Sequence, residues 1–368
     1  MKIDRRLLAN FDWILLFLVL SIAAVGLLNL YSAGHNLPHA GDPLYIKQSY
    51  WLIIGLMMMI IMFSIDYRFL VTYAYGIYGF SILLLLLVFF LGKMTHGSQR
   101  WLVLFGFSFQ PSELVKLTMI LALAKYFNDK QIDEGYYLRN LLILSFIIIV
   151  PFVLIVNQPD LGTSLFLVAL FSSIVVFVGI KKRILIIFSA AGLVLAPLCW
   201  FFIKDYQKER ILSFLNPERD PLGSGYHIIQ SIIAIGSGGL FGKGLLKGTQ
   251  SRLRFLPEQQ TDFVFSVFAE EWGFAGVFVL LCLFFALLLW GLRISRNSRD
   301  MAGTLISFGI IMFIFWGFFV NIGMVLGIFP VVGIPLPFLS YGGSSMIVLM
   351  MGVGLLMNIS MRRFVFQP

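Results

Sequence analysis

Residues 302–325 read AGTLISFGIIMFIFWGFFVNIGMV, a stretch without a charged side chain that is long enough to cross a bilayer as a helix. Comparable apolar runs recur along the chain. Hydropathy predicts spans near residues 12–32, 48–64, 70–91, 113–127, 139–157, 161–179, 184–203, 263–291, 302–325 and 340–361. The predicted fold class is all-α: a polytopic integral membrane protein with about ten transmembrane helices and a large periplasmic loop.

The composition excludes an ordinary soluble fold. The chain has 368 residues, of which 59% are hydrophobic and 12% are charged, whereas roughly 25% of residues are charged in a soluble domain. Its mean hydropathy is +0.92, and 38 Phe are spread over its whole length. We therefore predict one membrane domain, residues 1–368. The first span follows a basic start and has no A-x-A-like cleavage site, so we expect it to be retained.

The basic residues predict the orientation. An even number of spans puts both termini on one side of the membrane, and Lys and Arg gather in cytosolic loops. With cytoplasmic termini, the short outer loops hold only Lys47, Lys93 and Arg100, and the inner segments carry Lys2, Arg5, Arg6, Arg68, Lys125, Lys130, Arg139, Lys181, Lys182, Arg183, Arg293, Arg296, Arg299, Arg362 and Arg363. These small basic groups also account for the net charge of +9, so no nucleic acid is expected as a partner.

The outer segments are then residues 33–47, 92–112, 157–160, 204–262 and 326–339. The long loop 204–262 is large enough to be functional. Within it, residues 206–215 alternate charged and apolar side chains, which predicts a helix at the membrane interface. Residues 227–235 are apolar but too short to span, and we expect them to dip into the protein from the outer face.

Several patterns resemble other sites but lack the required context. Cys199 and Cys282 fall inside apolar runs, which argues against a disulfide. His35 and His39 are four residues apart among Gly and Pro, without the spacing of a metal site. The glycine-rich residues 236–244 contain Gly-Lys but no following Ser or Thr, so they do not predict a nucleotide site.

Two aspartates stand at ends of predicted outer segments. Asp262 precedes the apolar run 263–291, so its carboxylate is expected at the boundary between water and membrane. The alternative is a helix N-terminal charge that interacts with the helix dipole. Asp160 follows Asn157-Gln158-Pro159 and has the position of an N-cap. The number of spans puts both aspartates on the same face.

Two further carboxylate patterns lie inside predicted spans. Glu113 and Lys116 are three residues apart, so they share one side of a helix and can form a local ion pair after a Ser112 cap. Ionisable residues inside a membrane are also functional candidates. Glu270 and Glu271 are adjacent, so their side chains point about 100° apart and cannot both face one narrow site.

Several short motifs, taken together, resemble the SEDS family (shape, elongation, division, sporulation), and within it the members that act in cell elongation rather than division. They run over nearly the whole chain: RW 100–101, FQPSE 109–113 with Lys116, QPDLGT 158–163, DPLGSGYH 220–227, QS 230–231, GSGG 236–239, GTQS 248–251, LPE 256–258, TDF 261–263, EE 270–271 and LSYGGS 339–344.

The resemblance implies a peptidoglycan glycosyltransferase that polymerises lipid II into β-1,4-linked glycan strands on the outer face of the bacterial cytoplasmic (inner) membrane during elongation. Its implied partners are a class B penicillin-binding protein, other elongation-complex proteins and membrane lipid. It implies that Asp262 is the catalytic residue, as general base or as ligand of a divalent cation (Mg or Mn). The implied supporting residues are Glu113, Lys116, Asp160, Arg100, Arg210, His227, Gln230, Glu258 and Ser340.

Two other classes of function stay open at this point. Ten helices with ionisable residues in or near the membrane suit a flippase or transporter of lipid-linked precursors about as well as an enzyme. Such a transporter places its key groups near the membrane midplane, whereas these candidates gather at one face. A scaffold for the cell-wall machinery would tolerate the loss of Asp262.

Overall fold

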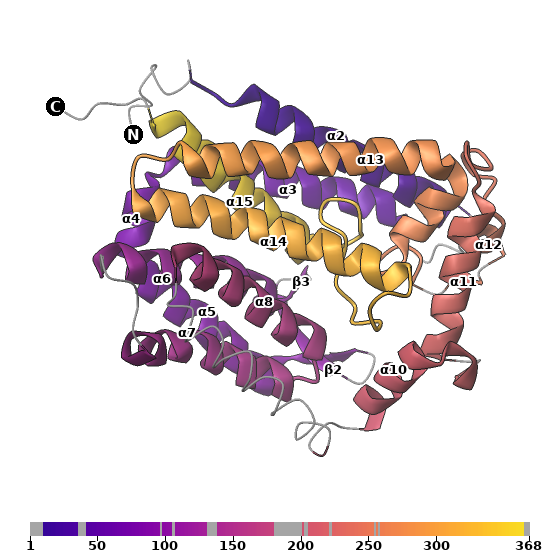
Figure 1. Cartoon of the computed structure of the whole chain (residues 1–368), viewed down its shortest axis with the longest axis horizontal. Helices are drawn as coiled ribbons and strands as arrows, with labels where there is room; N and C mark the ends of the chain where they lie inside the picture. Colours follow the sequence, from indigo (N-terminus) through magenta and orange to yellow (C-terminus); the bar gives the residue numbers. More distant parts are fainter. Residues whose placement is uncertain are drawn as a thin grey trace.

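The computed structural model describes residues 10–35, 42–95, 98–104, 107–130, 138–179, 201, 205–220, 223–253, 255–256 and 258–363. Apart from a short sheet, these residues form helices, and the long helices lie roughly side by side (Figure 1). Within these described ranges, seven helices are long and apolar enough to cross a membrane: α2 (Trp13–Gly34), α3 (Leu44–Ser64), α5 (Ala74–Leu91), α8 (Leu161–Val178), α13 (Val264–Arg296), α14 (Met301–Val325) and α15 (Gly343–Arg362). The protein is an all-α, polytopic membrane protein, as predicted.

Two more predicted spans form helices, α6 (Pro111–Asp129) and α7 (Leu138–Asn157). The predicted span 70–91 differs, because it is divided into a short α4 (Tyr67–Thr72) and α5 at the non-helical Tyr73. The Asp66 side chain caps α4 by accepting a hydrogen bond from the Arg68 amide (2.9 Å). The predicted span 184–203 lies almost entirely outside the described residues.

One end of the bundle gathers the start of α2, the start of α14 and the end of α15. The Ser360 hydroxyl donates to Asp12 beside α2 (2.9 Å). Arg362 pairs with Asp66 (2.9 Å), and Arg68 pairs with Asp300 ahead of α14 (3.4 Å). The segments that were predicted to share one side of the membrane therefore do lie at one end (Figure 1).

The opposite end carries a small antiparallel sheet in the segment that was predicted to be a loop, residues 92–112. Strands β1 (Lys93–Thr95), β2 (Ser98–Leu104) and β3 (Phe107–Phe109) pair in the order β1-β2-β3. In the register, Lys93 faces Trp101 and Leu102 faces Phe109. β2 is rich in aromatic and branched side chains, which favour strands.

The long outer loop folds into helices at this same end. It contains α10 (Asp205–Leu215), the 3₁₀ turn η1 (Pro217–Arg219), α11 (Ser224–Ser237) and α12 (Thr249–Arg252). The predicted helix 206–215 is confirmed as α10. The segment 227–235 lies within α11, which packs against α13 and buries Ile228, Ser231 and Ala234. Ile232 and Ile233 are exposed on α11, so one face of the segment packs on the bundle, and its entry into the protein from the outer face stays a prediction.

A break divides α13 near the same end. Gly273 has φ 63° and ψ −165°, so the helix stops and restarts there. The glycine-rich segment that follows α11 fills the gap. Lys243 N donates to Glu270 O (3.0 Å) and Gly244 N to Glu271 O (2.9 Å), while Phe274 N and Ala275 N donate to the carbonyls of Gly239 and Leu240 (both 2.9 Å). Both helix ends at the break are thereby satisfied.

Candidate active site

Asp262 lies in the tight turn that leads into α13 and is partly exposed. Neighbouring segments anchor this turn through its backbone. The Ser340 hydroxyl donates to Thr261 O (2.6 Å), Tyr341 N donates to Gln260 O (2.9 Å), and the Asn321 amide donates to Asp262 O (3.0 Å). Among the described residues, no group donates a hydrogen bond to the Asp262 carboxylate itself. The turn is therefore held rigidly while its carboxylate stays available.

A strap of four residues, Val331–Ile334, passes beside Asp262 after α14. Gly333 has φ 72°, and a Cβ at this position would lie 3.5 Å from Asp262 Oδ2. The Arg210 guanidinium on α10 donates to Val331 O (3.3 Å), and Asn321 donates to Ile334 O (2.8 Å). A Cβ added at Gly162, at the start of α8, would collide with Val332 O. The strap thus joins α8, α10 and α14 around the carboxylate.

Arg100 and Asp160 meet beside the start of α8. Asp160 is buried and caps the helix by accepting from Thr163 N (3.1 Å) and Thr163 Oγ1 (3.0 Å), so the predicted cap is confirmed. Arg100 reaches it from β2, with Nη1 3.6 Å from Asp160 Oδ2. The guanidinium also donates to the carbonyls of Gln158 (3.3 Å) and Pro159.

The surroundings of Asp262 raise the pKa of its carboxyl group. Burial raises the pKa of Asp262 from an ordinary 3.8 to about 6, and the charge of Glu258 acts in the same direction. The positive charges of Arg210 and Arg100 act against this, and Asp160 adds a smaller upward effect. Four charged residues that were predicted to support the site therefore act on the predicted catalytic residue, Asp262: Glu258, Arg210, Arg100 and Asp160.

Glu113 and Lys116 form a pair of their own inside the bundle. Their side chains are buried, with 2.5 Å between Lys116 Nζ and Glu113 Oε1. The ammonium also lies over the ring of Phe166, 4.6 Å from its centroid, and 5.4 Å from that of Phe313. The predicted ion pair is confirmed. The Ser112 cap is wrong, because Pro111 already starts α6 and Gln110 holds the cap position.

The remaining supporting residues take different places. Glu258 is exposed, has φ 51° and accepts a hydrogen bond from Thr261 Oγ1 (3.0 Å). His227 and Gln230 are half-buried on α11, with the His227 ring 6.1 Å from that of Phe263, and burial lowers the pKa of His227. Ser340 is an anchor, because its hydroxyl also accepts from Leu336 N (2.8 Å).

Glu270 and Glu271 lie just before the break in α13 and hold the outer loop. Glu270 is fully buried and accepts from Lys243 Nζ (2.7 Å), Thr249 N (2.7 Å) and Gln250 N (3.1 Å). Glu271 accepts from Leu246 N (3.2 Å) and from the Ser32 hydroxyl on α2. The side chains diverge, as expected for adjacent helix positions, yet both bind the segment 243–250.

The described residues around Asp262 do not form a metal centre made of protein ligands alone. Within the described ranges, no three side chains of His, Cys, Asp or Glu come together as metal ligands. Asp160, a buried carboxylate near Asp262, is already engaged with Arg100 and Thr163. We therefore assign no step to a bound cation.

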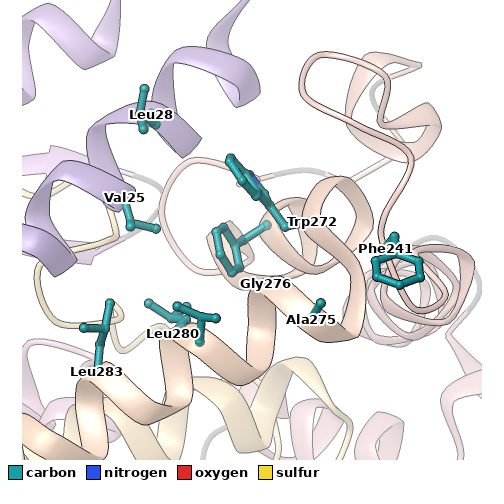
Figure 2. Close-up of a pocket in the computed structure, with 10 residues that line it drawn as sticks. Val25, Leu28, Phe241, Trp272, Ala275, Gly276, Leu280 and Leu283 are labelled. Carbon is teal, nitrogen blue, oxygen red and sulfur yellow. The ribbon is translucent and has the colours of Figure 1, made fainter.

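Two apolar pockets lie away from these residues. One, of about 390 Å³, lies between α2 and α13 beside the helix break, where Leu28, Phe241 and Trp272 line it (Figure 2). The other, of about 600 Å³, lies between α8 and α14 and is lined by Ser173, Phe308 and Trp316. Neither contains a residue that was singled out in the sequence.

Comparison with known proteins gives a consistent result. A model of cell cycle proteins, the FtsW/RodA/SpoVE family, matches residues 12–364. The peptidoglycan glycosyltransferase MrdB of Escherichia coli K12 is 46% identical over 311 residues, covering 84% of this chain and 83% of that protein. A chain of a peptidoglycan synthase complex, whose structure concerns the coordination of polymerization and crosslinking, is 34% identical with a TM-score of 0.82, covering 96% of this chain and 98% of that one. The crystal structure of RodA from Thermus thermophilus is 33% identical with a TM-score of 0.72, covering 97% and 98%.

Proposed function

The chain belongs to the FtsW/RodA/SpoVE family of cell cycle proteins and is a peptidoglycan glycosyltransferase, and we propose that it polymerises lipid II into β-1,4-linked strands with Asp262 as the general base. Its relatives MrdB and RodA carry the same activity in their names. The single observation that carries the assignment to Asp262 is its setting: a carboxylate without a hydrogen-bond donor among the described residues, on a rigid turn, with two arginines nearby.

The reaction takes place outside the cytosol of a bacterium, at the outer face of the cytoplasmic membrane. The charge distribution supports this orientation, since the end of the bundle opposite Asp262 carries the basic segments. Both termini are then cytoplasmic. The sheet, α10, α11 and the strap form the outer end, where a lipid-linked sugar can reach Asp262.

The chemistry is a single displacement at the anomeric carbon of the donor sugar. The acceptor 4-hydroxyl attacks that carbon and gives its proton to Asp262, while the bond to the lipid diphosphate breaks and the diphosphate leaves with the electron pair. Because attack comes from the opposite side, an α-linked donor gives a β-linked product. A pKa of about 6 leaves Asp262 mostly ionised at neutral pH and still basic enough to accept a proton.

Positive charge is needed where the diphosphate departs. Arg210 and Arg100 are the cations whose charges act on Asp262, and we assign to them the stabilisation of the leaving anion. The Arg210 side chain is exposed and held through Val331 O. A divalent cation, Mg or Mn, belongs to the proposal only as a companion of the substrate diphosphate.

We assign to the same function a class B penicillin-binding protein as partner, together with other proteins of cell elongation. This proposal rests on the similar chain found in a synthase complex that coordinates polymerization and crosslinking. A flippase for lipid-linked precursors is the less favoured function. The groups around Asp262 lie at one end of the bundle, whereas a transporter site is expected near the midplane.

The test is glycan polymerisation from purified lipid II by the wild-type protein and by Asp262→Ala, with and without a chelator. Asp262→Ala is expected to fold, insert and make no polymer. Polymer at the wild-type rate would refute the assignment. Asp129→Ala is the matched control, because Asp129 is half-exposed at the far end of α6 and pairs only with Lys125 among the described residues. Loss of activity with chelator, restored by Mg or Mn, would support the cation.

A further inference from the structure

A buried asparagine lies behind the Asp262 turn. Asn321 belongs to α14 and is fully buried. Its side-chain nitrogen donates one hydrogen bond to Asp262 O (3.0 Å) and another to Ile334 O (2.8 Å). Both partners are carbonyl oxygens, so only the NH₂ group of the amide can face them. Its two hydrogens are thus both used.

These two bonds join the two segments that shape the site. One holds the peptide of Asp262 itself. The other holds the strap at Ile334, next to Gly333, whose backbone passes beside Asp262 Oδ2. The strap also carries Val331 O, the acceptor for Arg210. A single amide therefore sets the position of the carboxylate relative to the strap and to a nearby cation.

Small polar side chains of similar size cannot make both bonds. An ionised Asp has no donor, and Ser has only one. The Asn321 amide oxygen is buried and has no partner among the described residues. A buried polar atom without a partner has a free-energy cost. The stabilisation that Asn321 provides therefore comes from its two donors.

We propose that Asn321 is a positioning residue for the glycosyl transfer, holding the Asp262 turn and the strap Val331–Ile334 in register through its two amide hydrogens. This inference rests on the proposed function. Asn321 does not touch the substrate. It acts by fixing where the Asp262 carboxylate lies relative to the strap.

The inference predicts a kinetic signature that differs from a loss of stability. Asn321→Ala should lower kcat on the order of 100-fold, the cost of a misplaced catalytic group, with a smaller change in KM for lipid II. Without the amide the turn loosens and the partly exposed Asp262 carboxylate gains further contact with solvent, so the acid limb of the pH profile should move to lower pH. The charged groups facing Asp262, from its own turn, α10, β2 and the start of α8, are unchanged: Glu258, Arg210, Arg100 and Asp160.

Asn358 provides a matched control at the opposite end of the bundle. It is also fully buried, lies on α15, and donates from its side-chain nitrogen to the carbonyls of Met62 (2.8 Å), Phe63 (3.1 Å) and Ile65. Asn358→Ala should therefore lower the melting temperature while the folded protein keeps its kcat and its acid limb.

The experiment measures kcat, KM and the pH profile of polymerisation for the wild type, Asn321→Ala, Asn321→Ser and Asn358→Ala, with melting temperatures in detergent. Asn321→Ser keeps one donor and should fall between the wild type and Asn321→Ala. It also replaces Asn321→Ala if that variant does not fold. Wild-type kcat and acid limb in Asn321→Ala, or in Asn321→Ser where only that variant folds, would overturn the inference. Equal effects in Asn358→Ala would also overturn it.

The wild type and Asp262→Ala are assayed with lipid II under the same conditions. If the wild type makes no polymer from lipid II, the proposed function fails, and if Asp262→Ala makes polymer at the wild-type rate, the assignment of the base to Asp262 fails. If Asp262→Ala is inactive and the Asn321 variants behave as wild type, only the positioning role fails.

Discussion

Arg100 and Asp160 are paired across two elements, with 3.6 Å between the guanidinium Nη1 on β2 and the carboxylate Oδ2 ahead of α8. The same carboxylate caps α8 through Thr163 N. The Asp160 side chain thus caps α8 and also forms a charged contact with Arg100. A conservative substitution can separate the capping from the charged contact.

Asp160→Asn is expected to impair polymerisation with little change in melting temperature. Asn caps helices about as well as Asp, so α8 keeps its start. The charge that orients Arg100 is lost. The control is Asp300→Asn at the other end, because Asp300 likewise caps a helix through Gly303 N (2.7 Å) and pairs with Arg68 (3.4 Å). If Asp160→Asn changed only the thermal stability, capping would be its sole role.

The pH profile of kcat/KM should fall on the acid side near pH 6, since the proposed base must be ionised and its pKa is about 6. The charge of Glu258 raises that pKa, so Glu258→Gln should move the acid limb to lower pH. Arg210 lowers it, so Arg210→Gln should move the limb to higher pH. Both shifts should shrink in high salt. Profiles that coincide would contradict the assignment of the acid limb to Asp262.

Asp262→Asn should raise the melting temperature at pH 7.5 even though it abolishes activity. The folded protein holds the proton of Asp262 more tightly than the unfolded chain, since the pKa rises from 3.8 to about 6. Stability from this group is therefore fully present below pH 3.8 and is lost as the pH rises through 6. The neutral amide avoids that loss. Thermal denaturation at pH 4 and pH 7.5 checks this, and an equal difference at both would contradict it.

Gly273→Ala should destabilise the protein strongly. Gly273 has φ 63°, and an added Cβ would collide with the backbone of Gly242. The effect is expected to exceed about 1 kcal/mol, the cost of the backbone conformation alone. Gly79→Ala is the control, because no atom lies within 4 Å of a Cβ added there, and Ala should favour α5. Melting temperatures compare the two, and equal values would show that the break tolerates a side chain.

Hydropathy predicted most of the bundle because length and apolarity alone identify a membrane span. It placed α14 and α15 within a few residues of their observed ends. It did not separate α4 from α5, since Tyr73 breaks the helix without a Pro or Gly. The sheet around Trp101 was missed because its strands are very short, with three residues in β1 and in β3.

The candidate site was predicted in part. Counting spans put Asp262, Asp160 and Arg100 at one end, and the structure brings them together. The sequence carried no signal for the role of Asn321, because it binds backbone carbonyls, which every residue has. It also could not show that the strap beside Gly333 passes the carboxylate, since that contact depends on tertiary packing.

The segment Gly239–Gly244 bridges the break in α13, because it makes four backbone hydrogen bonds with residues 270–275. Without the other segment, neither residues 239–244 nor residues 270–275 would have partners for these backbone groups. A one-residue insertion or deletion in the glycine-rich segment would therefore misalign two helix ends at once, including the short helix that follows Asp262. Chimeras between relatives should exchange residues 239–275 as one block rather than cut between the loop and the helix.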